Sequence, residues 1–187
     1  MLSRISSLSA RRMKKAVLVG LLLAATSAAQ KYTTDGELVL PPDYRQWVFL
    51  SSGIGMTYSN EPNDHPVFDN VFVNPATYQA FLKTGTWPDK TVLVIENRAS
   101  GSNASNKEGK FQTKWTGFEA HIKDSSKGGW MFYYIPPSGK SGKAFPKTAV
   151  CYTCHEKNAA TDTTFVQFYP TLIETATKKG TYREPAE

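Results

Sequence analysis

Two cysteines and a histidine lie within five consecutive residues in the last quarter of the sequence. Cys151 and Cys154 are the only cysteines among 187 residues, and His155 follows the second one directly. A Cys-x-x-Cys-His run is the attachment pattern of c-type haem. The two thiols add to the two vinyl groups of the porphyrin, and the adjacent histidine binds the iron. The motif predicts one covalent haem c, with thioether links at Cys151 and Cys154 and with His155 as the axial ligand.

Cysteines at this spacing also serve other chemistry. A thioredoxin-type redox pair is expected at a strand–helix boundary of an α/β pattern, which this sequence lacks. A structural zinc site needs four ligands, and the chain has no second cysteine pair. A disulfide is the ordinary use of two cysteines in an oxidising compartment. Haem attachment is favoured because a histidine follows the pair and because the chain begins with an export signal.

The first 29 residues differ in kind from the rest. Basic residues precede an uncharged apolar run, Ala16 to Ala25, and small residues follow it. This layout predicts a signal peptide over 1–29, with a retained anchor as the alternative, and a periplasmic haem domain over 30–187. The signal contains five of the 22 Lys and Arg residues and none of the 16 acidic residues. The remainder is nearly neutral, so nucleic acid is not an expected partner.

The rest of the chain alternates between apolar runs and turn residues. Five runs are predicted to be strands: 44–50, 71–73, 91–96, 115–123 and 130–135. A helix is predicted over 75–83, between an Asn74 cap and Gly85, and a second helical pattern begins at Thr161. The segments 99–109 and 138–143 read as loops. The fold class is therefore mainly β (α+β): an antiparallel sheet with a few helices and a haem near the C-terminus.

The residue on the other side of the iron decides what a haem protein does. Apart from His155, the mature chain has two histidines and two methionines: His65, His121, Met56 and Met131. His65 precedes a proline in a polar stretch and reads as a surface residue, whereas Met131 reads as core packing. An open coordination position is therefore a consistent alternative to a second protein ligand.

Six stretches of this sequence resemble the cytochrome P-460 family, which also includes the cytochromes c′-beta. They are Gly36–Trp47, Val71–Tyr78, Lys83–Gly85, Gly117–Asp124, Cys151–His155 and Thr161–Pro170. The resemblance implies a homodimer built on an antiparallel sheet, with a haem that is five-coordinate through His155. Some members carry a lysine cross-linked to the porphyrin and oxidise hydroxylamine. Others lack the link and bind nitric oxide or related gases.

Two positions of the family pattern bear on activity. Ile95 occupies the position of the cross-linking lysine, which implies an ordinary thioether-bound haem here. Glu119 matches the distal carboxylate that acts as a base, and His121 would share its face as a relay or, alternatively, bind the iron. From alternation alone, both side chains also fit the solvated face of a half-buried strand. Burial against haem would raise the pKa of Glu119 toward a useful range.

Aromatic residues near the motif are candidates to enclose the haem. Phe165 and Phe168 follow the motif closely and are expected to pack around it. Four others could cap the opposite side, although aromatic residues in strands are usually core: Phe72, Phe111, Trp115 and Phe118.

Three functions stay open at this stage. The first is a haem protein with an open iron that binds or converts nitric oxide or hydroxylamine, with a small cytochrome as redox partner. The second is an electron carrier whose iron is closed by a second protein ligand. The third is a gas-binding protein without turnover, which would follow from Ile95.

Overall fold

The computed structural model describes residues 30–57 and 65–184. The predicted signal peptide, 1–29, lies outside the described residues. Within those two ranges, no helix is long and apolar enough to cross a lipid bilayer.

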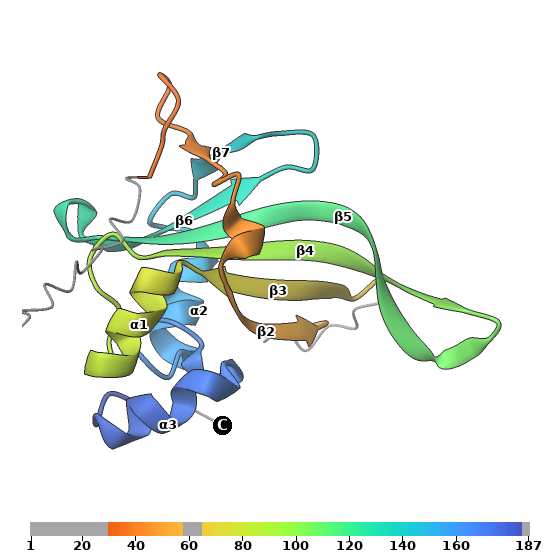
Figure 1. The fold of residues 1–187 in the computed structure, drawn as a ribbon. Coiled ribbons are helices and arrows are strands. Elements are labelled where there is room, and N and C mark those ends of the chain that lie inside the picture. The colour runs from red at the N-terminus through yellow and green to blue at the C-terminus, as the bar shows by residue number, and fades with distance from the viewer. Residues whose placement is uncertain (1–29, 58–64, 185–187) are drawn as a thin grey trace, which may run out of the picture.

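A seven-stranded antiparallel sheet forms the body of the molecule (Figure 1). Its strands are β1 (Leu38–Val39), β2 (Val48–Ile54), β3 (Val67–Val73), β4 (Val92–Asn103), β5 (Asn106–Asp124), β6 (Gly129–Ile135) and β7 (Ser141–Ala144). Their spatial order is β1-β7-β6-β5-β4-β3-β2, so neighbours from β2 to β7 are also consecutive in the chain. The predicted fold class is confirmed.

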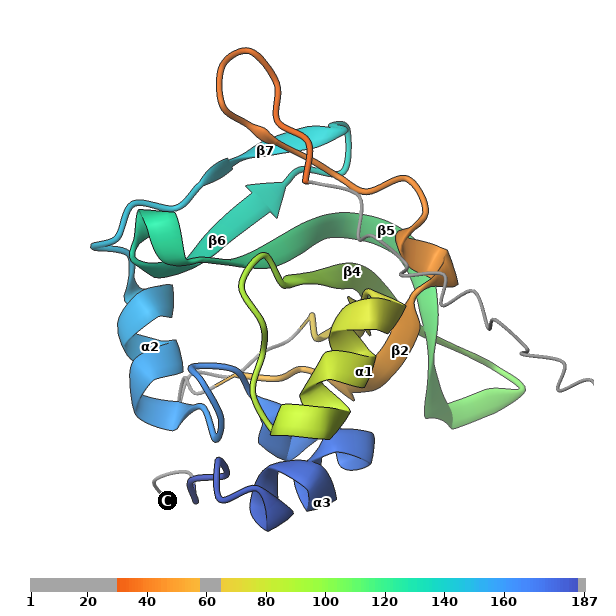
Figure 2. The ribbon, with the colours of Figure 1, turned by 60° about the vertical axis from the view of Figure 1, so that its left-hand side comes forward.

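Alternating side chains give the sheet two different faces. On β5, Phe118, Ala120 and Ile122 join one apolar cluster, which the N-terminal segment covers through Leu38 and Tyr44. The opposite face carries a second cluster, to which α1 (Pro75–Thr84) and α3 (Pro170–Lys178) contribute and on which α2 (Val150–Asn158) packs. We call these the N-terminal face and the helical face. Figures 1 and 2 show the three helices gathered on one side of the sheet.

The predicted helix after β3 is confirmed. The Asn74 side chain accepts a hydrogen bond from the Ala76 amide at 2.9 Å, and Pro75 supplies the fixed first turn. Gly85 ends the helix in the left-handed conformation, with φ of 75°. Phe81 of this helix is fully buried and packs on Trp87, with ring centroids 4.4 Å apart.

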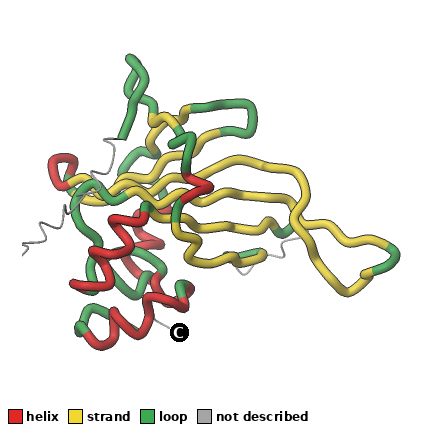
Figure 3. The backbone as a smooth tube through the Cα atoms, in the orientation of Figure 1, coloured by secondary structure: helices red, strands yellow, loops and turns green. Residues whose placement is uncertain are grey.

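The predicted loop over 99–109 is wrong, because most of it is strand. β4 and β5 pair as far as Asn103 and Asn106, and Figure 3 shows this hairpin extending beyond the other strands. Asn103 Oδ1 accepts hydrogen bonds from the Ser105 and Asn106 amides and so stabilises the turn. Cross-strand pairing overrides the low strand propensity of the Ser, Asn and Gly residues.

Two other boundaries differ from the prediction. The expected strand over 44–50 begins with a 3-10 helix, Tyr44–Gln46, and becomes strand only at Val48. The expected loop over 138–143 contains β7, which pairs with both β1 and β6. At Gly142 an added Cβ would lie 1.9 Å from the Tyr134 carbonyl oxygen, so glycine is required for this close pairing.

The helix predicted from Thr161 begins later. Residues 161–164 form a tight turn closed by a bridge between Thr161 and Thr164, and a 3-10 helix, Val166–Phe168, follows. The α-helix α3 starts at Pro170, which fits the first-turn position because proline has no amide hydrogen to donate. Periodic apolar residues such as Tyr169 and Leu172 are buried as expected.

Candidate haem-binding site

The Cys-x-x-Cys-His motif lies on α2. Cys151 and Cys154 are three residues apart and His155 is four from Cys151, so the spacing brings all three to neighbouring positions on one side of the helix. Both cysteines are free thiols and half-buried. Burial raises the pKa of the Cys151 thiol above its ordinary value. Both thiols are unpaired, as required for addition to vinyl groups.

Tyr152 attaches α2 to the sheet. Its hydroxyl accepts a hydrogen bond from the Phe132 amide and donates one to the Phe145 carbonyl, both at 3.3 Å. Lys147 lies over the Tyr152 ring and donates to the Trp130 carbonyl at 2.7 Å. The motif is thus tied to β6 by its own second residue.

His155 is held in one orientation by a backbone contact. Its Nδ1 lies 2.8 Å from the Thr163 carbonyl oxygen. A carbonyl only accepts, so Nδ1 is the protonated nitrogen and Nε2 keeps its lone pair. Burial, with a further contribution from the charge of His121, lowers the pKa of His155 to about 4, against the opposing Thr163 hydrogen bond. The ring is therefore neutral at pH 7, the form that binds iron.

Aromatic rings surround His155. Its ring centroid lies 4.4 Å from that of Phe132, 4.5 Å from Phe165 and 4.9 Å from His121. Phe168 stacks on Phe165 at 5.9 Å and is 37% exposed. Both phenylalanines predicted to pack around the haem therefore lie beside the predicted axial ligand, Phe165 directly and Phe168 through it.

Glu119 and His121 lie on the helical face of β5. His121 Nε2 is 3.6 Å from Glu119 Oε2; the His121 side chain is 10% exposed and the Glu119 side chain 45%. Burial raises the pKa of Glu119, but the interaction with His121 and the charge of His155 outweigh it, and the net pKa is lowered. The expected upward shift is therefore not found in the protein chain itself, because the interaction with His121 favours the ionised carboxylate.

Ile95 lies directly beside this pair. It opposes Glu119 across the β4–β5 ladder and is 7% exposed within the helical-face cluster. The neighbouring position on β3 is Val71. The aliphatic residue Ile95, with Val71 beside it, thus occupies the place where the family resemblance implies a lysine.

Sequence reasoning missed Asp69. It lies two residues before Val71 on β3, and its Oδ1 accepts a hydrogen bond from Asn97 Nδ2 at 2.7 Å. Burial raises the pKa of Asp69 to about 6; the Asn97 hydrogen bond opposes this shift and the charge of Glu119 adds to it. The even spacing of Asp69 from Val71 is the signal that could have placed it on the helical face.

Several residues considered for the distal side lie elsewhere. Phe72, Trp115 and Phe118 pack with the N-terminal-face cluster, as does Met131, so the predicted aromatic cap is not found on the face of His155. Phe111 is 40% exposed on the hairpin beyond the sheet. Strand parity explains the error for Phe72 and Phe118, because even-numbered positions there point away from the helices. Trp115 is odd-numbered and joins them through the bulge between Asn97 and Arg98. His65 and Met56 are both exposed.

The residues present fit a c-type haem. Two free thiols and one imidazole with an available Nε2 lie on the same helix, beside aromatic rings. Over 30–57 and 65–184, no group of three or more His, Cys, Asp or Glu side chains is placed to hold a metal ion by itself.

Comparison with known families agrees with this site. Residues 41–166, more than half of the chain, match the family described as Cytochrome P460. A comparison with curated proteins finds no match. The matched range includes β2 to β7, the entire motif and the turn that holds His155. The chain belongs to the cytochrome P-460 family and is a haem protein of that kind.

Proposed function

We propose that this chain is a periplasmic mono-haem c-type cytochrome with an iron site that is open opposite His155 and that binds or converts small nitrogen compounds. The observation that carries the proposal is the Nδ1 contact of His155 with Thr163 at 2.8 Å, beside two unpaired thiols. It leaves a single lone pair directed away from the turn. Export of the chain is supported by the N-terminal sequence layout alone.

When bound, the haem supplies a redox-active iron that takes nitric oxide or hydroxylamine as a ligand. The chain supplies proton handling. Glu119, with its lowered pKa, is ionised at neutral pH and accepts a proton, and His121 at 3.6 Å relays it. Both lie on one wall of the site, in consecutive outward positions of β5.

His121 lies close to the predicted axial ligand. Its ring contacts the His155 ring edge-on, at 4.9 Å between centroids and 81° between planes. A haem held through His155 would separate the two rings, and His121 would then serve the open site as the proton relay. An electron carrier whose iron is closed by His121 is the alternative, and the response of the spectrum to added ligand distinguishes the two.

A gas-binding protein without turnover is the second candidate, and Ile95 favours it. An aliphatic side chain at this position cannot form the amine link to the porphyrin that the resemblance associates with hydroxylamine oxidation. Glu119 would then tune ligand affinity by accepting or repelling a polar ligand. A homodimer and a small-cytochrome redox partner complete the proposal on the strength of the family.

The absorption spectrum of the haem-loaded protein, ferric and reduced, tests these assignments together with a pyridine haemochrome assay. A c-type haemochrome with a high-spin spectrum that responds to nitric oxide supports the open site. A low-spin spectrum insensitive to added ligand would instead select the electron carrier. A strongly red-shifted reduced Soret band would reveal a cross-link and would overturn the interpretation of Ile95.

A further inference from the structure

The backbone that holds His155 is itself in an unfavourable conformation. Asp162 and Thr163 have φ of 49° and 54°, in the left-handed region that residues other than glycine rarely adopt. For Thr163 the branched side chain makes the cost larger. Such a turn persists only where surrounding contacts determine it, and it marks a place where the backbone carries out a function.

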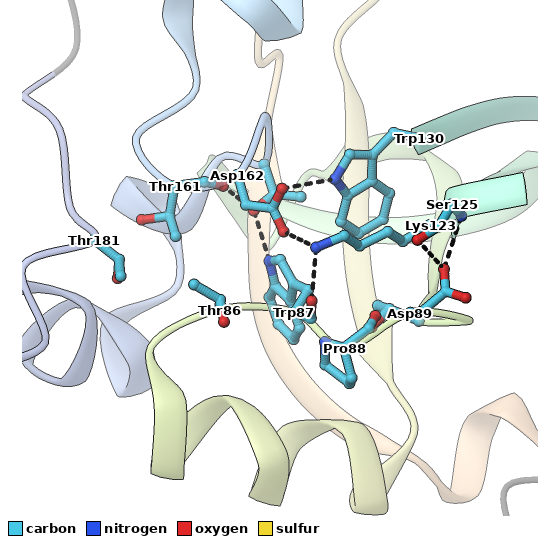
Figure 4. A network of polar contacts seen from close by, with 12 residues as sticks. Thr86, Trp87, Pro88, Asp89, Lys123, Ser125, Trp130, Thr161, Asp162 and Thr181 are labelled. Atoms are coloured by element: carbon cyan, nitrogen blue, oxygen red, sulfur yellow. Dashed lines mark hydrogen bonds and ion pairs between the residues drawn. The ribbon is translucent and has the colours of Figure 1, made fainter. Parts of the chain in front are cut away.

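An ion pair anchors one side of this turn. Lys123, from the end of β5, donates to Asp162 Oδ2 at 2.7 Å and to the Trp87 carbonyl at 2.7 Å. The Trp130 indole nitrogen approaches Asp162 Oδ1 at 3.4 Å from β6. Figure 4 shows Lys123 between Asp162 and Trp87, with Trp130 above. The Lys123 and Asp162 side chains are only 22% and 25% exposed, so solvent screens the pair weakly.

A second contact anchors the other side. The Trp87 indole nitrogen donates to Thr164 Oγ1 at 2.7 Å, and that hydroxyl donates to the Thr161 carbonyl at 2.7 Å. Trp87 is 1% exposed and Thr164 is 1% exposed. Both ends of the turn are therefore fixed to the segment between α1 and β4 and to the sheet.

Between these anchors, the Thr163 carbonyl is the group presented to His155. We propose that Lys123 and Asp162 are positioning residues that hold this carbonyl on His155 Nδ1 and thereby set the electron-donating strength of the axial imidazole. The proposal rests on the proposed binding of the haem iron by His155. A hydrogen bond from the N–H of a metal-bound imidazole makes the ring a stronger donor. A stronger donor stabilises the ferric iron and lowers the reduction potential.

The test uses the haem-loaded protein with Lys123→Met, Asp162→Asn and the double variant. Resonance Raman of the reduced form gives the iron–histidine stretching band, and a redox titration gives the midpoint potential. The expected result is a band at lower frequency and a more positive potential in both single variants. The double variant should shift no further than the larger single change, because both substitutions remove the same contact.

Lys90→Met is the matched control. The Lys90 side chain forms ion pairs with Asp124 and Asp89 at the same end of β5, rather than with Asp162. It should leave band and potential unchanged. Lys123→Arg keeps the positive charge and should retain the wild-type band at least in part. A general loss of structure at this position would not predict that difference from Lys123→Met.

Unchanged band and potential in folded Lys123→Met and Asp162→Asn would overturn the proposal, as would an equal shift in Lys90→Met. If Lys123→Met does not fold, Asp162→Asn decides alone, since it keeps the size and shape of the side chain. A pyridine haemochrome assay of the wild-type protein separates the two levels of inference. Absence of a c-type haem there would refute the proposed function itself.

Discussion

Two glutamates on adjacent strands have opposite surroundings. Glu96 on β4 lies on the N-terminal face, is 3% exposed, and pairs with Tyr44, Arg45 and Arg98. Glu119 on β5 lies on the helical face with a 45% exposed side chain, and its partner there is His121 Nε2 at 3.6 Å. Burial, together with the contact and charge of Glu96, raises the pKa of the Tyr44 hydroxyl above its ordinary value. One carboxylate is fully satisfied by the protein, and the other is not.

The different surroundings indicate that the Glu96 carboxylate stabilises the fold, whereas the Glu119 carboxylate is available to interact with a ligand. Glu96 joins the 3-10 helix at Tyr44 to the centre of the sheet, and a buried charge of this kind is tolerated because every oxygen has a partner. Glu119 retains acceptor capacity toward whatever occupies the helical face. Neutralising Glu96 should therefore lower stability with little effect on reactivity. Neutralising Glu119 should lower reactivity with little effect on stability.

Removing both thiols should have the largest effect. We expect Cys151→Ala with Cys154→Ala to abolish covalent haem completely, because no other cysteine exists in the chain. Haem staining of a denaturing gel measures this directly, with the wild-type chain as control. Haem that stays attached after denaturation in this variant would contradict the assignment of the helical face as the attachment site.

If the haem-loaded protein oxidises hydroxylamine, Glu119→Gln should reduce the rate by about 100-fold, the usual contribution of a proton-transfer group. That factor corresponds to about 2.7 kcal/mol in activation free energy. Thermal stability should change little, because the side chain is half exposed. The measurement is the turnover rate with an artificial electron acceptor. An undiminished rate would remove Glu119 from the reaction and leave it a surface carboxylate.

Glu96→Gln should show the reverse pattern. We expect the free energy of unfolding to fall by about 2 kcal/mol, because charge-assisted hydrogen bonds to Arg45 and Arg98 are lost. Urea denaturation measures the loss, and the reaction rate of the folded protein serves as the control. If Glu96→Gln lowered the reaction rate and left stability unchanged, the assignment of Glu96 to a structural role would be wrong.

Asp69→Asn should have the smallest effect, and it depends on pH. The native pKa of about 6 lies above the ordinary 3.8, so the native state binds more protons than the unfolded chain between those values. This contribution is complete below pH 3.8 and is lost as pH rises through about 6. The variant should flatten that part of the stability profile and be more stable than the wild-type protein at pH 7. Parallel profiles for both proteins would contradict the shifted pKa.

The sequence predicted much of this architecture because its strongest signals are local. Strict alternation from Phe118 to Lys123 placed β5 and gave Glu119 and His121 a common face, and the Asn74 cap with Gly85 placed α1. The family of the chain was also predictable, since the Cys151–His155 motif and the segment after it are distinctive.

Features that depend on long-range pairing were not predictable. The Ser- and Asn-rich hairpin becomes strand only through backbone pairing between Ser100 and Gln112 and their neighbours. Likewise, the turn at Asp162 and Thr163 contradicts local propensity and is held by Lys123, 39 residues earlier in the chain. The aromatic cap was misplaced because composition reports which residues are apolar, whereas parity decides the face they occupy.

The consecutive order of β2 to β7 has a consequence for how this protein is assembled. Each strand from β3 to β7 pairs with its immediate predecessor in the chain, so most of the sheet can form rapidly from local hairpins. The attachment motif begins at Cys151, after the last strand ends at Ala144. The wall that carries Glu119 can thus be complete while the motif is still extended and accessible to attachment enzymes. If the haem is attached at this point, docking of α2 and α3 on the helical face would follow it.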